Sequence, residues 1–153
     1  MLGRTYEGQN CSAARTLELV GERWTLLILR DVLLRDMKTF GEFLASLGIA
    51  RNVLSARLDH LVREEVLRRR PYGGHADHYE YLPTDKAADL LPVILALTAW
   101  GDRWAAPQGP PALFRHSSCG GAVEQKLECA ECGELVDPRQ VVAVPGPGRR
   151  GMM

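Results

Sequence analysis

This chain of 153 residues has no net charge of either sign, because 19 Lys and Arg balance 19 Asp and Glu. A zero balance excludes a chain that binds nucleic acid or an acidic surface through its overall charge. Lysine is also scarce, with three residues, so that nearly all the basic residues are arginines. Contact with a polyanion must therefore depend on a local cluster of arginines.

Long apolar segments are also lacking. The first ten residues, MLGRTYEGQN, contain no apolar run of the kind found in a signal peptide. The longest apolar stretch, Leu90 to Trp100, is too short to cross a bilayer and lies between Asp89 and Asp102. We therefore expect a cytoplasmic protein with no membrane partner. In that compartment, four cysteines indicate metal ligands or redox thiols more than a disulfide framework.

The sequence lacks the common catalytic signatures and shows no internal repeat. It has no Gly-rich phosphate loop, no paired histidines of a metal hydrolase and no nucleophile elbow. No cysteine or carboxylate flanks His75 and His78 at ligand spacing, which argues against a metal site there. We therefore do not expect an enzyme, and a thiol-dependent activity at Cys11 is the remote alternative.

Residues Thr39 to Leu82 carry the most informative pattern. Thr39 and Glu42 form a capping-box pair that starts a helix ending at Leu47, and Gly48 permits a sharp turn. A second helix is predicted from about Arg51 to Glu65, followed by two short strands around a Gly-rich loop. A helix–turn–helix followed by a hairpin is the layout of a winged helix, which places one helix in the DNA major groove.

The second helix should bury its leucines and expose a polar face near its N-terminus. Arg51, Asn52 and Ser55 lie on that face, and Arg matches guanine as Asn matches adenine. An ordinary solvated helix face is the alternative. Local charge favours DNA, since residues 49–75 hold six Arg against three acids.

The predicted hairpin adds arginines at its base and a small, flexible tip, which suits phosphate and minor-groove contacts by a wing. We accordingly expect double-stranded DNA as a partner. The predicted DNA-contacting residues are Lys38, Thr39, Arg51, Asn52, Ser55, Arg57, Arg69, Arg70, Gly74 and His75.

Flanking helices are predicted on both sides of this module. Ser12 is a plausible N-cap for a helix over Ala13 to Val20, and a helix from Arg23 to Arg35 should use Trp24 as a core anchor. Thr84 should cap a long helical stretch that reaches Trp104, with Pro92 either kinking it or marking its true start. Its apolar residues form two stripes, which suggests packing on its own domain and on a second subunit. A ligand pocket lined by Trp100 and Trp104 is the alternative use of these stripes.

Prolines and glycines from Pro107 to Pro111 mark a boundary. We predict two domains: residues 1–106 form the DNA-binding and dimerisation domain, and residues 107–153 form a linker, a small Cys-containing appendage and a disordered C-terminus. The appendage holds two knuckles of the form (C/H)-x2-C-G, which resemble the halves of a zinc ribbon. Bound zinc would supply on the order of 10 kcal/mol. The expected zinc ligands are His116, Cys119, Cys129 and Cys132. A tail of reduced, unliganded thiols is the alternative.

Cys11 is a candidate redox sensor. It precedes a predicted helix N-terminus with Arg15 one turn away, and both place positive potential near the sulfur, which favours the reactive thiolate. Oxidation or alkylation at that place would disturb the neighbouring helix. The alternative is an inert thiol that fills space.

Together these segments resemble HxlR-type regulators, a group related to MarR proteins. The similarity runs in order from Cys11-Ser-Ala-Ala-Arg through Phe40-Gly-Glu-Phe, Gly48-Ile-Ala-Arg-Asn and Tyr79-Glu-Tyr to Trp100-Gly-Asp-Arg-Trp104. It implies a mainly α fold with a small β-hairpin, homodimers formed by terminal helices, and regulation, most simply repression, at near-palindromic promoter sites. Some such regulators sense electrophiles or oxidants through a cysteine at the place of Cys11, and a small-molecule effector is therefore expected.

The chain departs from these regulators in places. Ala50 stands where an N-capping Ser is frequent, at a cost of about 1 kcal/mol to the second helix. Leu82-Pro83-Thr84 and Gly73-Gly74-His75 also differ from the usual hairpin. A winged helix that holds a protein partner instead of DNA is the second functional hypothesis.

Overall fold

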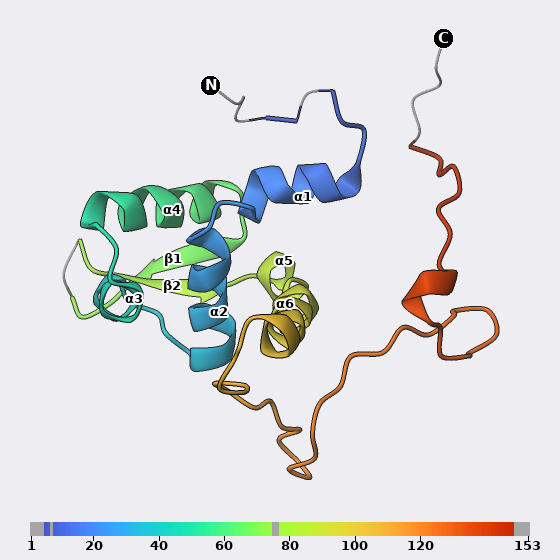
Figure 1. Cartoon of the computed structure of the whole chain (residues 1–153). Coiled ribbons are helices and arrows are strands. Elements are labelled where there is room, and N and C mark those ends of the chain that lie inside the picture. The colour runs from blue at the N-terminus through green and yellow to red at the C-terminus, as the bar shows by residue number, and fades with distance from the viewer. Residues whose placement is uncertain (1–4, 7, 75–76, 149–153) are drawn as a thin grey trace. The chain divides into compact units, whose positions relative to one another are not determined.

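A computed structural model of the chain describes residues 5–6, 8–74 and 77–148. It confirms a mainly helical fold with a two-stranded antiparallel hairpin (Figure 1). The chain divides into two compact units, one ending at Ile94 and one starting at Leu95. The domain boundary after residue 106 stays a prediction. The elements are α1 (Ser12–Val20), α2 (Thr25–Arg35), α3 (Phe40–Leu47), α4 (Arg51–Arg63), β1 (Leu67–Pro71), β2 (Tyr79–Pro83), α5 (Asp85–Ala88), α6 (Leu91–Trp104) and the 3-10 turn η1 (Pro138–Gln140).

The predicted helix–turn–helix is present as α3 and α4. Thr39 is the N-cap of α3, and both hydrogen bonds of the capping box form between Thr39 and Glu42. Gly48 ends α3 with φ at 61°, in the left-handed region that glycine adopts without strain. Ala50 begins α4 without a side-chain cap, as its methyl group dictates. Helix α4 stops at Arg63, two residues before the predicted end, because Glu65 takes a positive φ of 57° and turns the chain into β1.

The core of the first unit lies where α2, α3, α4 and the hairpin meet. Phe43 of α3 is fully buried and contacts Tyr81 of β2 edge to face, with ring centroids 6.2 Å apart. This contact fixes the hairpin against the helix–turn–helix. The other residues with under 2% of their surface exposed are Thr25, Ile28, Leu29, Asp31, Leu54, Leu58, Leu61, Val66, Leu67 and Ala87.

Asp31 is a fully buried carboxylate that sequence analysis did not single out. Its Oδ1 pairs with Arg30 Nη2 at 2.7 Å and lies 3.4 Å from Arg35 Nη1. The Ser46 hydroxyl donates to Asp31 Oδ2 at 2.6 Å. The buried charge is therefore compensated on both oxygens, and it joins α2 to α3.

The N-terminal predictions need two corrections. Helix α1 starts at Ser12, and Cys11 rather than Ser12 occupies the N-cap position. Trp24, predicted as a core anchor, is only half-buried, because it lies at the N-cap of α2 before the first inward-facing turn. The Arg23 guanidinium covers its ring at 4.8 Å.

The hairpin is anchored to the chain segment before α3. In its register Arg69 pairs with Tyr81 and Pro71 with Tyr79. On its other side, the Tyr81 N–H donates to the Lys38 carbonyl at 2.7 Å, and Thr39 bridges to Glu80. Residues 38–39 thus extend the two-stranded sheet by a short third segment, which joins the wing to the start of α3.

The long helical stretch after Thr84 is divided into α5 and α6. Pro92 falls in the first turn of α6, where its missing N–H costs nothing, so it marks the start of that helix as one of our two alternatives predicted. Ile94 is buried, but Leu97, Trp100 and Trp104 are each more than half exposed. These three side chains are thus open in the single chain, and the predicted packing of the stripe on a second subunit stays a prediction. No helix among the described residues is long and apolar enough to cross a membrane.

Candidate nucleic-acid interface

The outer face of α4 is polar and open. Arg51, Asn52 and Ser55 are all exposed, and Ser55 follows the other two by four and three residues, which places the three side chains on one side of the helix. The opposite side carries Leu54 and Leu58, which are fully buried. The same helix therefore offers a rigid base on one side and hydrogen-bonding groups on the other.

Arg51 is supported by an aromatic ring of the preceding helix. Its guanidinium carbon lies 5.1 Å from the ring centroid of Phe40, a cation–π contact. Such a contact orients the side chain without using its N–H donors. All five donors of Arg51 thus stay available for a carboxylate, a phosphate or a guanine edge.

Arg57 lies apart from this face. Its side chain is 32% exposed, and its Nε lies 3.9 Å from Glu22 Oε2, in the segment that joins α1 to α2. The Nε atom itself is buried. The structure thus directs Arg57 toward the α1 side of the unit and not toward the side that Arg51 occupies. Its role as a DNA contact stays a prediction.

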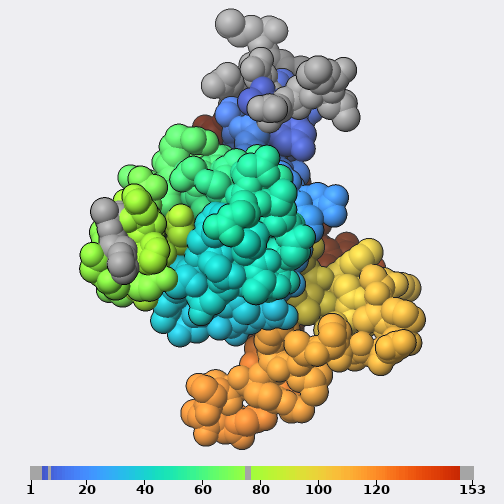
Figure 2. Space-filling model, turned by 90° about the vertical axis from the view of Figure 1, so that its left-hand side faces the viewer, coloured from blue at the N-terminus to red at the C-terminus, as the bar shows by residue number. Residues whose placement is uncertain are grey.

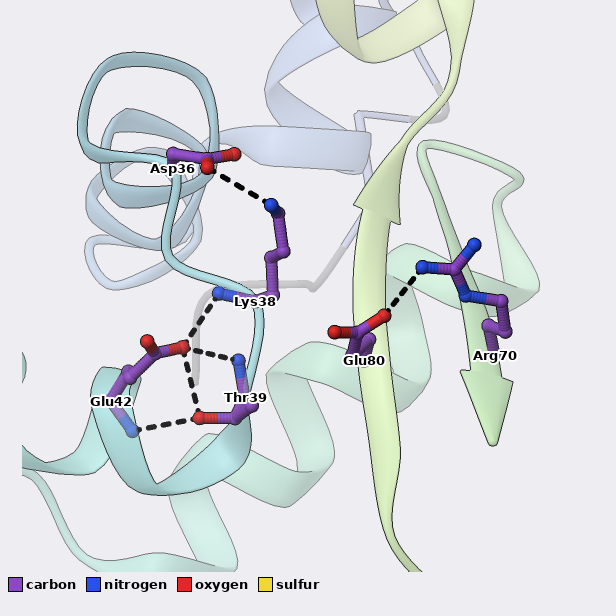
Figure 3. Close-up of polar contacts among 6 residues, drawn as sticks. All are labelled: Asp36, Lys38, Thr39, Glu42, Arg70 and Glu80. Carbon is purple, nitrogen blue, oxygen red and sulfur yellow. Dashed lines mark hydrogen bonds and ion pairs between the residues drawn. The ribbon is translucent and has the colours of Figure 1, made fainter. Parts of the chain in front are cut away.

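Lys38 and Thr39, at the start of α3, belong to a closed set of polar contacts (Figure 3). Glu42 Oε2 accepts from the Lys38 and Thr39 N–H groups at 2.9 and 2.8 Å, and from the Thr39 hydroxyl at 2.9 Å. These donors hold the pKa of Glu42 below its usual value. The Lys38 ammonium binds Asp36 at 2.9 Å, which raises the pKa of Lys38 and keeps it charged.

The wing places its arginines beside acidic partners. Arg70 Nη2 pairs with Glu80 Oε2 at 2.6 Å across the hairpin, as Figure 3 shows. Arg69 Nη1 lies 3.8 Å from Asp59 Oδ1 of α4, and its guanidinium stacks over the Tyr79 ring at 4.9 Å. A polyanion would have to compete with these carboxylates, each of which is partly solvated.

The tip of the hairpin is the Gly-rich loop that the sequence predicts. Gly73 and Gly74 have φ angles of 68° and 71°, in the region that other residues rarely adopt. His75, a predicted contact, lies outside the described residues.

Helices α3 and α4 and the hairpin share one face of the first unit (Figure 2). Among the described residues of α3, α4 and the hairpin, Arg51 and Arg68 are arginines without an ion pair, so they can meet phosphate without first losing a partner. Arg51 lies at the start of α4, whereas Arg68 lies at the base of the hairpin near Thr84 and Lys86.

Cys11 is an exposed thiol at the N-cap of α1. The backbone N–H groups of Ala14 and Ala13, in the first turn, lower the pKa of Cys11. The pKa of Cys11 is thus lowered, as predicted, and the cause is the helix backbone and not the charge of Arg15. The thiolate fraction at neutral pH is raised accordingly.

Helix α1 is joined to α4 through His60. The His60 Nε2 donates to the Leu19 carbonyl at 2.8 Å, and its Nδ1 accepts from Arg63 Nη2 at 3.1 Å. Both bonds fit the neutral tautomer that carries its proton on Nε2. A groove beside this connection is lined by residues of both helices, including Leu17, Glu18 and Ala56, and by Tyr6 of the segment before α1. A displacement of α1 therefore reaches the C-terminal half of α4 directly.

The four predicted metal ligands fall into two pairs. His116 Nδ1 lies 3.3 Å from Cys119 Sγ, and the Gly121 N–H points to the same sulfur at 3.4 Å. In the other pair, the N–H groups of Cys132 and Glu131 lower the pKa of Cys129. Within the described ranges 5–6, 8–74 and 77–148, no three His, Cys, Asp or Glu gather as a metal-binding group.

Comparison with known proteins gives a consistent assignment. The HxlR-like helix-turn-helix family matches residues 19–109. An uncharacterized HTH-type transcriptional regulator of Mycobacterium tuberculosis is 43% identical over 96% of this chain and 92% of its own length. Two solved structures of candidate transcription factors also match almost the whole chain. The first has a TM-score of 0.80 at 30% identity, covering 92% of this chain and 99% of its own. The second, from Pseudomonas aeruginosa, has a TM-score of 0.64 at 38% identity, covering 92% and 95%.

Proposed function

The chain belongs to the HxlR-like helix-turn-helix family, and from this premise we propose that it is a transcriptional repressor that binds near-palindromic promoter sites as a homodimer. Regulation of transcription through DNA binding agrees with the names of its relatives, and the chain is not an enzyme. The symmetric site, the homodimer and the direction of regulation are the finer parts of the proposal.

The observation that carries the proposal is the division of α4 into two faces. Three buried leucines fix the helix, while Arg51, Asn52 and Ser55 are free to meet base edges. These residue types are the usual readers of guanine and adenine in the major groove. The hairpin, carried on the same face, supplies arginines for the flanking phosphates.

Genome-wide recovery of bound fragments tests the proposal. We expect the purified chain to enrich fragments with inverted half-sites about one helical turn apart, with an affinity that falls steeply as salt rises. A reporter gene behind such a fragment should be less active when the chain is present. Capture of a stoichiometric protein partner without salt-sensitive DNA binding would support the interaction-module hypothesis instead.

The homodimer proposal depends on α6. Val93, Leu97, Trp100 and Trp104 are 44, 51, 62 and 64% exposed, and their spacing of four, three and four residues aligns them along one side of the helix. An apolar stripe of that length is costly in water, and the same stripe on a second copy would cover it.

Light scattering after gel filtration tests this contact. The wild-type chain should have the mass of a dimer, and Trp100→Glu should shift it toward a monomer. Val142→Glu is the matched control, because Val142 is 79% exposed but lies outside the stripe. A strictly monomeric wild-type chain, or equal effects of the two substitutions, would contradict the proposed interface.

We further propose that Cys11 senses oxidants or small electrophiles. Its lowered pKa makes it reactive, and α1 is joined to α4 by the Leu19–His60 hydrogen bond and by Glu22 near Arg57. Modification of Cys11 at the first turn would displace α1 and so disturb the recognition helix.

A single substitution tests the sensor. Oxidant or quinone should release the wild-type chain from DNA, and Cys11→Ser should bind DNA as tightly but no longer respond. Persistence of the response in Cys11→Ser would remove Cys11 from the mechanism. In that case another thiol, or a different effector, would have to carry the signal.

A further inference from the structure

The segment after α6 contains a duplicated hairpin, although no repeat was apparent from the sequence. The first knuckle (residues 114–123) and the second knuckle (residues 127–136) have the same three backbone hydrogen bonds, offset by 13 residues. In the first, His116 N–H donates to Gly121, Gly120 to His116 and Val123 to Phe114, at 2.9, 2.8 and 3.3 Å. In the second, Cys129 donates to Glu134, Gly133 to Cys129 and Val136 to Leu127, each at 2.9 Å.

The turns of the two knuckles also agree. Gly120 and Gly133 take φ angles of 69° and 70°, and a single bridge closes each hairpin, Arg115 to Ala122 and Glu128 to Leu135. A positive φ at equivalent places explains why glycine follows the second ligand of each pair. The same local geometry is thus built twice from two different sequences.

Each knuckle presents two metal-binding side chains at its turn. His116 Nδ1 and Cys119 Sγ lie 3.3 Å apart in the first, and Cys129 and Cys132 hold the equivalent positions in the second. The Gly121 N–H donates to Cys119 Sγ at 3.4 Å, so the backbone of the turn faces this sulfur. One imidazole nitrogen and three thiolates form a donor set that zinc prefers in structural sites.

No apolar core holds these knuckles. All residues from 105 to 148 are described, and none of them is buried. Leu113, Val123, Leu127 and Leu135 are 68, 49, 50 and 64% exposed. Two hairpins, each closed by one bridge, are too small to persist in water on backbone hydrogen bonds alone. A different source of stability is needed, and small domains of this size often obtain it from a metal.

We propose that His116, Cys119, Cys129 and Cys132 bind one Zn²⁺ in a closed, four-coordinate structural site. Each cysteine thiol loses its proton to solvent on binding, and the imidazole binds as the neutral form. With four protein ligands no position stays open for water or substrate, so the site stabilises the segment and does not catalyse a reaction. The two pairs stand apart in the described structure, and binding brings the knuckles together through the short connection between Val123 and Leu127.

Elemental analysis of the full chain, purified under reducing conditions without added metal, tests the site. We expect one zinc per chain in the wild type and its loss in Cys129→Ser and Cys132→Ser. Cys11→Ser is the matched control, because this exposed cysteine lies in the other unit and should leave the zinc content unchanged. Well-folded wild type with sub-stoichiometric zinc, or with iron in its place, would overturn the proposal.

A ligand exchange separates coordination from a general role in folding. His116→Cys makes the two knuckles equivalent, and it should retain zinc, whereas His116→Ala should lose it. After replacement of zinc by Co²⁺, the wild type should show sulfur-to-cobalt absorption, and the d–d bands should shift in His116→Cys. Unshifted bands would exclude His116 as a ligand. Salt-sensitive binding to DNA is measured separately for each variant, so that loss of zinc and loss of DNA binding by the winged helix are distinguishable.

Discussion

Replacing Arg51 by alanine should reduce sequence-specific DNA binding much more than it reduces stability. Arg51 is exposed, forms no ion pair among the described residues and lies over Phe40 at 5.1 Å. If it reads a guanine, its loss costs about 1–3 kcal/mol of specific binding, or about 5- to 150-fold in affinity. The exposed cation–π contact contributes only about 0.5–1 kcal/mol to folding. The two effects therefore differ in size and can be measured separately.

Titration of the recovered site and of random DNA, each at several salt concentrations, gives the answer. Arg51→Ala should weaken the specific site and leave random DNA nearly unchanged. Arg57→Ala is the matched control on the same helix, since its Nε is buried beside Glu22, and it should leave discrimination intact. Arg68→Ala should weaken both DNAs equally and lower the salt slope by about 1. Equal losses on both DNAs for Arg51→Ala, or lost discrimination in Arg57→Ala, would refute our assignment of the reading face.

Three further predictions concern stability and reactivity. The pKa of Glu42 is lower in the folded chain than in the unfolded chain, so its capping interactions stabilise the fold at pH values above the unfolded-state pKa. This stabilisation is lost as the pH falls through the folded-state pKa. The free energies of unfolding of wild type and Glu42→Gln, measured with urea, should therefore differ at pH 7 and converge in acid. Asp31→Ala should lower the free energy of unfolding by about 1–3 kcal/mol, because Ser46 loses its acceptor while Arg30 stays partly hydrated; a change within error would contradict a structural role. Alkylation of Cys11 should be faster in the native chain than in urea at neutral pH and should rise with pH, and equal rates would show that the first turn does not activate it.

Local rules predicted the centre of this fold well. The capping box at Thr39 and the left-handed Gly48 depend on neighbours within a few residues, and both are present as expected. The leucine spacing of α4 likewise follows from helical periodicity. Where the outcome depends on distant partners, the predictions were weaker. Trp24 was assigned to the core by its residue type alone, yet its position at a helix end leaves it half-buried.

The candidate site shows the same limit. The sequence placed Arg51, Asn52 and Ser55 on one face, because that requires only a helix. It gave no indication that Arg57 meets Glu22 or that Arg69 meets Asp59, since these pairs join residues from separate elements. The buried Asp31 was missed for a related reason: a single acid within an apolar helix gives a signal only when Arg30 and Arg35 are recognised as its partners.

The hydrogen bond from the Tyr81 N–H to the Lys38 carbonyl has a consequence for the length of DNA that one subunit of the proposed dimer would read. It ties the wing to the first helix of the helix–turn–helix, so the two cannot slide along the duplex independently. The base pairs contacted by the recognition helix and by the wing must then keep a fixed spacing. Inserting a single base pair within a half-site should therefore abolish recognition by that subunit. In the proposed dimer, an insertion between the two half-sites would leave each half-site recognisable and would change only the spacing that the two subunits have to span.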